Sequence, residues 1–135
     1  MSGAEVELES WRRTLHLVGF DDGQVVRHAA EVFADANQRQ TRLYLDAQVM
    51  LESIPASMRL GAVTNGAFDS QWQKLRATEI ADRFDAIVIS ADLGVMKPGP
   101  AIFVEALHRL NVEPGEAWHV GGSSSLTFLS PTLWV

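Results

Sequence analysis

The sequence predicts an α/β fold, in which a Rossmann-like parallel sheet is preceded by a small helical region. In the first third of the chain, apolar residues recur every three or four positions, as is typical of amphipathic helices. From residue 58 on, short apolar runs alternate with helical patterns in the order strand, helix, strand, helix, strand. Because this alternation is typical of parallel sheets with right-handed crossovers, we expect a helical region over 1–46 and a sheet-containing core over 47–135.

Three helices are expected before the sheet. Leu8, Trp11, Leu15 and Val18 lie at helical spacing and predict a helix over 4–18, which "GFDDG" interrupts. Asp21 or Asp22 would cap the second helix, whose apolar face contains Val26, Ala29, Ala30, Phe33 and Ala36. "LYLDAQVMLESIP" predicts a short third helix that ends before its proline.

The core elements follow in order. "LGAVT" reads as a strand buried on both faces, and residues 69–77 as a helix capped near Asp69. "DAIVIS" predicts a second strand, and "KPGPAIFVEALHRL" predicts a helix that carries a proline in its first turn, where it is tolerated. "AWHV" over 117–120 is the expected third strand, and "TLWV" at the end of the chain is a candidate fourth.

Composition and charge exclude several classes of protein. The 135 residues carry a formal net charge of −6, which disfavours nucleic acid as a partner, and no basic cluster suggests an anionic membrane. No apolar stretch reaches the roughly 18 residues that span a bilayer, and the polar N-terminus is unlike a signal peptide. Because cysteine is absent, disulfides, thiolate nucleophiles and cysteine metal sites are excluded. We therefore expect a cytoplasmic protein.

Polar residues and glycines stand where the predicted strands end. Thr64, Asn65, Gly66, Ser90 and Gly121 all occupy such positions, and ligands of parallel sheets bind at the carboxyl ends of the strands. Taken alone, Thr64 is more simply read as a hydroxyl that caps a turn. Lys97, which follows the second strand, is likewise more simply read as a solvated surface lysine.

Taken together, three segments resemble the haloacid dehalogenase-like (HAD) hydrolase superfamily. They are "VTNG", "GVMKPGPAIF" and "VGG", each after a predicted strand, and the similarity covers about residues 58–122. "WRRTLHLVGFDDG" and the helix after it resemble the helical cap of the phosphatase and dehalogenase branch, so residues 1–46 would be a cap remnant.

The resemblance implies a role for each residue of the strand-end cluster. Thr64 would hydrogen-bond a phosphate oxygen, Lys97 would neutralise charge on the phosphoryl group, and Asn65 and Gly66 would offer backbone amides. We therefore expect Thr64 and Lys97 to converge on one anion, with a small phosphorylated or anionic metabolite as the ligand.

The acidic motifs of the family are not found in this sequence. Hydrolysis in the family begins with an aspartate of a D-x-D motif, and Mg²⁺ is held in part by an acid that follows the last strand. No D-x-D occurs here, Gly122 stands where that last acid is expected, and "SSSLTFLSP" contains no acid. Mg²⁺ is thus implied by the family while no metal ligand is predicted. The Asp21–Asp22 pair could be a degraded first motif, but we favour its interpretation as a helix cap.

The predicted function is therefore a truncated HAD-like hydrolase of phosphatase or dehalogenase type with impaired catalysis. Whether the chain is an enzyme stays open. The alternatives are a non-catalytic module that binds anions or regulates, and an inactive gene fragment. Without the family's central strand, we expect residues 60–64 and 117–120 to pair directly, because unpaired buried backbone is costly. Otherwise the open edges could pair with another copy in a homodimer. The four histidines show no metal spacing and are expected to be structural.

Overall fold

The computed structural model describes residues 2–120, which form two compact units. The helical unit combines the residues up to Ser53 with Ala67–Ala81. The sheet unit combines Ile54–Gly66 with the described residues from Asp82 on. The helical unit thus takes in 67–81, which the sequence division assigned to the core. The division into a cap remnant over 1–46 and a core over 47–135 stays a prediction.

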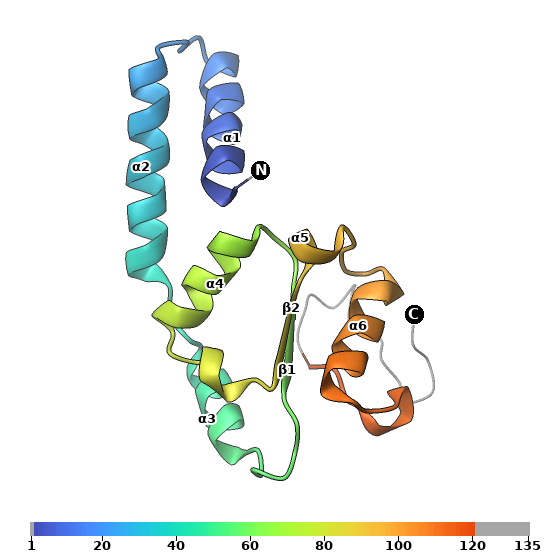
Figure 1. The fold of residues 1–135 in the computed structure, drawn as a ribbon. Helices are drawn as coiled ribbons and strands as arrows, with labels where there is room; N and C mark the ends of the chain where they lie inside the picture. Colours follow the sequence, from blue (N-terminus) through green and yellow to red (C-terminus); the bar gives the residue numbers. More distant parts are fainter. Residues whose placement is uncertain (1, 121–135) are drawn as a thin grey trace. The chain divides into compact units, whose positions relative to one another are not determined.

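The first two helices of the helical unit form a hairpin (Figure 1). Helix α1 (Gly3–Leu17) begins with a capping box, in which Ser2 and Glu5 bond each other's backbone amides. Helix α2 (Gly23–Gln40) begins at Asp22, whose carboxylate accepts from the Gln24 amide at 2.7 Å. Both predicted helices are confirmed. The alternative reading of Asp21–Asp22 as a degraded first motif is wrong, because that motif would follow a strand and the residues before the pair belong to α1.

Two shorter helices complete this unit. Helix α3 (Leu45–Ser53) buries Leu51, and helix α4 (Phe68–Ala77) packs against α1 and α2. The predicted cap of α4 near Asp69 is wrong, since the helix begins after Ala67 without a side-chain cap. The two carboxylate oxygens of Asp69 instead accept from the Gly3 amide at 2.9 and 3.0 Å. Asp69 therefore fastens the first turn of α1 to α4.

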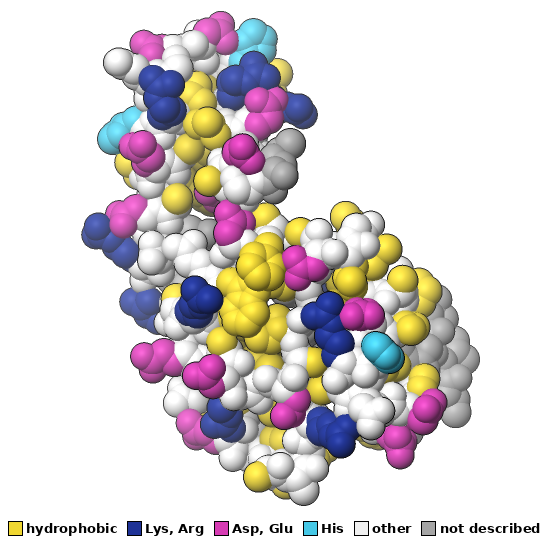
Figure 2. Space-filling model, in the orientation of Figure 1, with side chains coloured by type: hydrophobic (Ala, Val, Ile, Leu, Met, Phe, Trp, Pro, Cys, Tyr) yellow, Lys and Arg dark blue, Asp and Glu magenta, His cyan; other side chains and the backbone are white. Residues whose placement is uncertain are grey.

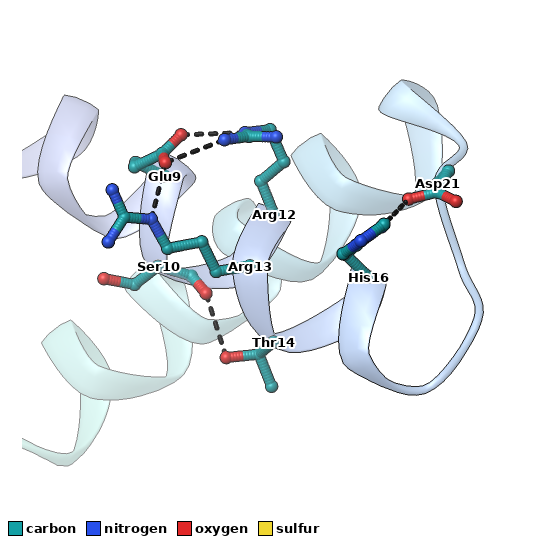
Figure 3. A network of polar contacts seen from close by, with 7 residues as sticks. All are labelled: Glu9, Ser10, Arg12, Arg13, Thr14, His16 and Asp21. Atoms are coloured by element: carbon teal, nitrogen blue, oxygen red, sulfur yellow. Dashed lines mark hydrogen bonds and ion pairs between the residues drawn. The ribbon is translucent and has the colours of Figure 1, made fainter.

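The exposed side of the hairpin carries charges of both signs, interspersed on the face that Figure 2 shows. Glu9 accepts from Arg12 and Arg13 at 2.7–2.8 Å, and the His16 Nδ1 atom lies 2.6 Å from Asp21 (Figure 3). Among residues 2–120, no helix combines the length and the apolar character that crossing a bilayer requires.

The sheet unit is built on two parallel strands, β1 (Gly61–Thr64) and β2 (Ala86–Ile89). Their register pairs Gly61 with Ala86 and Thr64 with Ile89. The sheet unit also contains α5 (Ser90–Leu93), α6 (Pro100–Leu110) and the 3₁₀ turn η2 (Pro114–Glu116), and the 3₁₀ turn η1 (Ala81–Arg83) leads into it from the helical unit. The order β1, α4, β2, α6 confirms the first four elements of the predicted alternation.

The core of the sheet unit lies between α6 and the strands. Val88 and Ile102 are fully buried, and Phe103 and Ala106 complete the cluster, which Val63, Leu93 and Val95 flank. Helix α6 buries Ile102, Phe103, Ala106 and Leu107, which lie on one face of the helix. Burying an aliphatic side chain of this kind contributes about 1.5–3 kcal/mol to stability.

The third predicted strand is not formed in the described part of the chain. Residues 117–120 are in no strand, and Trp118 and Val120 are 77% and 72% exposed. The sheet described contains only β1 and β2, so the predicted pairing of 60–64 with 117–120 is wrong for residues 2–120. The side chains of residues 117–120 alternate between more and less buried, as in a strand. A strand also needs a neighbouring strand with which it forms its ladder of hydrogen bonds. The candidate strand "TLWV" lies outside the described residues.

Candidate functional site

The parallel register brings two polar loops to one edge of the sheet. Thr64 ends β1 and pairs with Ile89, which ends β2. The chain therefore leaves both strands at the same level, through Asn65 and Gly66 on one side and Ser90 on the other. This is the carboxyl edge, where the ligands of parallel sheets bind.

Two hydrogen bonds join the Asn65 side chain to the backbone of Lys97. The Asn65 Nδ2 atom donates to the Lys97 carbonyl at 3.0 Å, and the Lys97 amide donates to Asn65 Oδ1 at 2.8 Å. The side-chain amide of Asn65 thus pairs with both the backbone N–H and the backbone carbonyl of Lys97, which lies 32 positions further along the chain. The loop that carries Lys97 is thereby held against the end of β1.

A second contact joins Gly66 to Ser90. The Gly66 amide donates to Ser90 Oγ at 3.0 Å, and the Ser90 side chain is buried. Gly66 has a φ of 139°, a conformation that residues with a Cβ rarely adopt. The amide that the resemblance assigned to a phosphate oxygen is therefore engaged by Ser90 in this structure. A phosphate would have to replace that hydroxyl.

Ser90 is the contact that sequence reasoning left without a role. The sequence placed it at a strand end but gave no partner for its hydroxyl. The signal that could have found it is the register. In a parallel pair of strands, the residue after Ile89 lies beside the loop that follows Thr64.

His119 lies within the electrostatic reach of Lys97. Partial burial, and then the positive charge of Lys97, lower the pKa of the His119 imidazole below its usual range. The ring packs edge-on against Phe103 of α6, with the centroids 5.2 Å apart. His119 was expected to be structural, and its packing against Phe103 agrees with that expectation. Its proximity to Lys97 adds a titratable neighbour to the cluster.

Three of the four predicted site residues thus lie in two connected loops: Asn65, Gly66 and Lys97. The Thr64 hydroxyl makes a long contact of 3.4 Å to the Asn65 carbonyl. Convergence of the Thr64 hydroxyl and the Lys97 ammonium on one anion stays a prediction. Gly121, Gly122 and the tail after them lie outside the described residues.

The carboxylates near these loops do not fit a magnesium site by themselves. Magnesium prefers octahedral oxygen ligands and commonly takes carboxylates. Between residues 2 and 120, no three His, Asp or Glu side chains are grouped so that they could hold a metal ion. Asp92 on α5 is the acid nearest in sequence to Lys97, while Asp21 and Asp22 belong to the helical unit. We therefore derive no chemical step through a metal.

The sequence profile of the haloacid dehalogenase-like hydrolases matches residues 12–125. The chain belongs to this family. The match takes in both loops of the candidate site and most of the helical hairpin.

Curated relatives of the chain are phosphatases. It is 37% identical over 109 residues to a glyceraldehyde 3-phosphate phosphatase of Methanopyrus kandleri, a match that covers 79% of this chain and 47% of the relative. It is 36% identical over 96 residues to a phosphoserine phosphatase of Thermus thermophilus, a match that covers 70% of this chain and 38% of the relative. An N-acylneuraminate-9-phosphatase of Rattus norvegicus is 25% identical over 140 residues, a match that covers 97% of this chain and 56% of the relative.

The chain spans about half the length of the curated relatives it matches, or less. Phosphatases of this family typically use Mg²⁺, and these relatives are named for small phosphorylated metabolites. Their activities belong to proteins that contain further sequence.

Proposed function

We propose that this chain carries the phosphate-holding part of a HAD-type phosphatase site and binds a small phosphorylated metabolite there. The observation that supports it most is the pair of hydrogen bonds between Asn65 and Lys97. These bonds fix the lysine loop beside the loop that follows β1, so the residues that match the family's anion-binding motifs lie on neighbouring loops.

The proposed roles follow from the chemistry of each group. The Thr64 hydroxyl would donate one hydrogen bond to a phosphate oxygen, and the Lys97 ammonium would supply positive charge as a compact point donor. The Asn65 side chain would position Lys97 and would not contact the phosphate. Gly66 would bring the backbone close to the anion, since no Cβ intervenes.

We expect the 135-residue chain to hydrolyse phosphate esters slowly. Hydrolysis in the family starts with attack by an aspartate of a D-x-D motif, and this sequence contains no such motif. Loss of a nucleophile that acts within a concerted site costs on the order of a million-fold in rate. The second candidate function is therefore a non-catalytic module that binds phosphate. The hydrogen bond between the Gly66 amide and Ser90 favours neither candidate over the other.

Binding and turnover are tested separately. Titration of the ¹⁵N-labelled chain with inorganic phosphate should give saturable amide shifts at Asn65 and Lys97, which Thr64→Val and Lys97→Met should weaken by tenfold or more. Thr14→Val and Arg27→Met, exposed positions on the hairpin, are the matched controls and should bind phosphate as the unmodified chain does.

Release of a chromophore from an aryl phosphate in the presence of magnesium measures turnover. Saturable binding without turnover would support the non-catalytic module. Absence of binding at tens of millimolar phosphate would refute the proposed site.

A further inference from the structure

The helical unit contains a polar pocket that shares no residue with the proposed phosphate site. It lies among α1, α2 and α4, has a volume of about 90 Å³, and is lined mainly by polar side chains. All of its lining residues belong to the helical unit, so its geometry is set within that unit.

One stripe of α2 lines this pocket. Ala34, Asn37, Gln38 and Thr41 lie at i, i+3, i+4 and i+7, which is one stripe along a helix. Ala34, Asn37 and Gln38 are exposed, and polar side chains are usual on the solvent side of an amphipathic helix. The two primary amides at the centre of this stripe form one wall of an open polar groove.

Helix α4 repeats the same spacing on the opposite wall. Ser70, Gln73, Lys74 and Ala77 also lie at i, i+3, i+4 and i+7. In both stripes, alanine occupies one end and polar side chains occupy the rest. The polar side chains make this a groove that an apolar ligand would not favour.

The pocket holds one charge of each sign, and the two do not neutralise each other directly. Glu7 of α1 and Lys74 of α4 both line it, yet no ion pair within 4.0 Å joins them. Neither side chain has a hydrogen-bond or ion-pair partner among the described residues. The same holds for the side-chain amides of Asn37, Gln38 and Gln73. These donors and acceptors line the groove, and most of the side chains that carry them are exposed.

We propose that this pocket binds a small zwitterion, of the class of α-amino acids with a short side chain. A cationic amino group would pair with Glu7, and a carboxylate would pair with Lys74 and the Gln73 amide. A ligand with a single charge would leave one of the two protein charges unmatched. The volume of about 90 Å³ is several times the roughly 10–15 Å³ that a cavity needs to hold one water molecule, so the groove has room for a small ligand.

The proposal is tested first on the unmodified full chain with a set of matched probes. Glycine carries both charges, acetate only the anion and methylammonium only the cation. Glycine should shift the amide signals of Asn37, Gln73 and Lys74 saturably, with a Kd at least fivefold lower than that of either single-charge probe. Equal binding of acetate or of methylammonium, or no saturable shift from glycine, would overturn the proposal.

Variants then assign the charges. Glu7→Gln and Lys74→Met should each raise the Kd for glycine about fivefold, which corresponds to about 1 kcal/mol for an exposed ion pair. Glu31→Gln and Arg27→Met change the same charges outside the pocket and should leave the Kd unchanged. Lys97→Met should also leave it unchanged, which separates this pocket from the phosphate site. Glycine binding that is insensitive to both Glu7→Gln and Lys74→Met would contradict the assignment even if the probe series succeeds.

Discussion

Replacing Asn65 by alanine tests whether the amide of Asn65 holds the lysine loop in place. The substitution removes two hydrogen bonds, of 3.0 and 2.8 Å, that join Asn65 to the backbone of Lys97. A hydrogen bond in a folded protein contributes a net 0.5–1.5 kcal/mol, so two contribute about 1–3 kcal/mol. Because Asn65 is exposed and water can replace part of the loss, we expect the lower half of that range, about 1–2 kcal/mol.

Asn65→Asp makes the test more specific. A carboxylate keeps the acceptor for the Lys97 amide but loses the donor to the Lys97 carbonyl, so the loss of stability should be intermediate. Gln48→Ala is the control, since it removes an exposed amide whose bond to Glu52 stays within one turn of α3. Its effect should be below about 0.5 kcal/mol.

Two measurements decide the outcome. Urea unfolding gives the change in stability, and hydrogen exchange of the Lys97 amide reports the local opening of the loop. A loss of 1.4 kcal/mol that is local to the loop would speed that exchange about tenfold. If Asn65→Ala unfolds like Gln48→Ala and the Lys97 amide exchanges at its original rate, the amide does not hold the loop. The proposed positioning role of Asn65 would then be refuted.

Three further predictions follow from contacts described above. Gly3→Ala should destabilise the helical unit by about 1–3 kcal/mol in thermal unfolding, because its Cβ would lie 2.1 Å from Ser70 Oγ. Gly23→Ala, at the same position of α2, has its nearest neighbour at 3.7 Å and should be tolerated. The Arg12 and Arg13 hydrogen bonds lower the pKa of Glu9 to about 2, from 4.5, so its contribution to stability is present above pH 4.5 and lost as the pH falls toward 2. Carboxyl NMR titration measures it, and an unshifted Glu9 in low salt would contradict the network. The lowered pKa of His119 likewise means that its contribution is present above the unfolded value near 6.5 and lost below it. Lys97→Met should raise that pKa in an imidazole titration, and an unchanged value would show that burial alone lowers it.

The helices were predictable because each leaves a signature within a short window of sequence. Trp11 and Leu15 repeat at the period of α1, Asp22 is a typical cap residue, and the apolar face of α6 is continuous along its length. Such local patterns are set by the geometry of one helix and one buried face, so they do not depend on the rest of the fold.

The contacts that build the candidate site depend on the rest of the fold. Nothing near Asn65 in the sequence shows that its amide meets the backbone of Lys97, because only the register of β1 and β2 brings the two loops together. The strand predicted for "AWHV" was wrong for a related reason. Its alternating pattern resembles that of a strand, but whether a neighbouring strand is available to pair with it depends on the tertiary fold. The sequence analysis did not single out the stripe on α4, because only the packing of α4 with α1 and α2 makes it a wall of a pocket.

The order in which the chain visits its two units limits how the protein can be divided. The chain leaves the helical unit after Ser53, returns to it at Ala67 and leaves again after Ala81. A fragment that began after Ser53 would therefore still contain α4, but without α1 and α2, against which that helix packs. Conversely, a fragment that ended at Ser53 would lose Asp69, the acceptor of the first amide of α1. Separate expression of either unit thus requires a spliced chain, with residues 67–81 joined after Ser53 and a short linker closing the gap between Gly66 and Asp82.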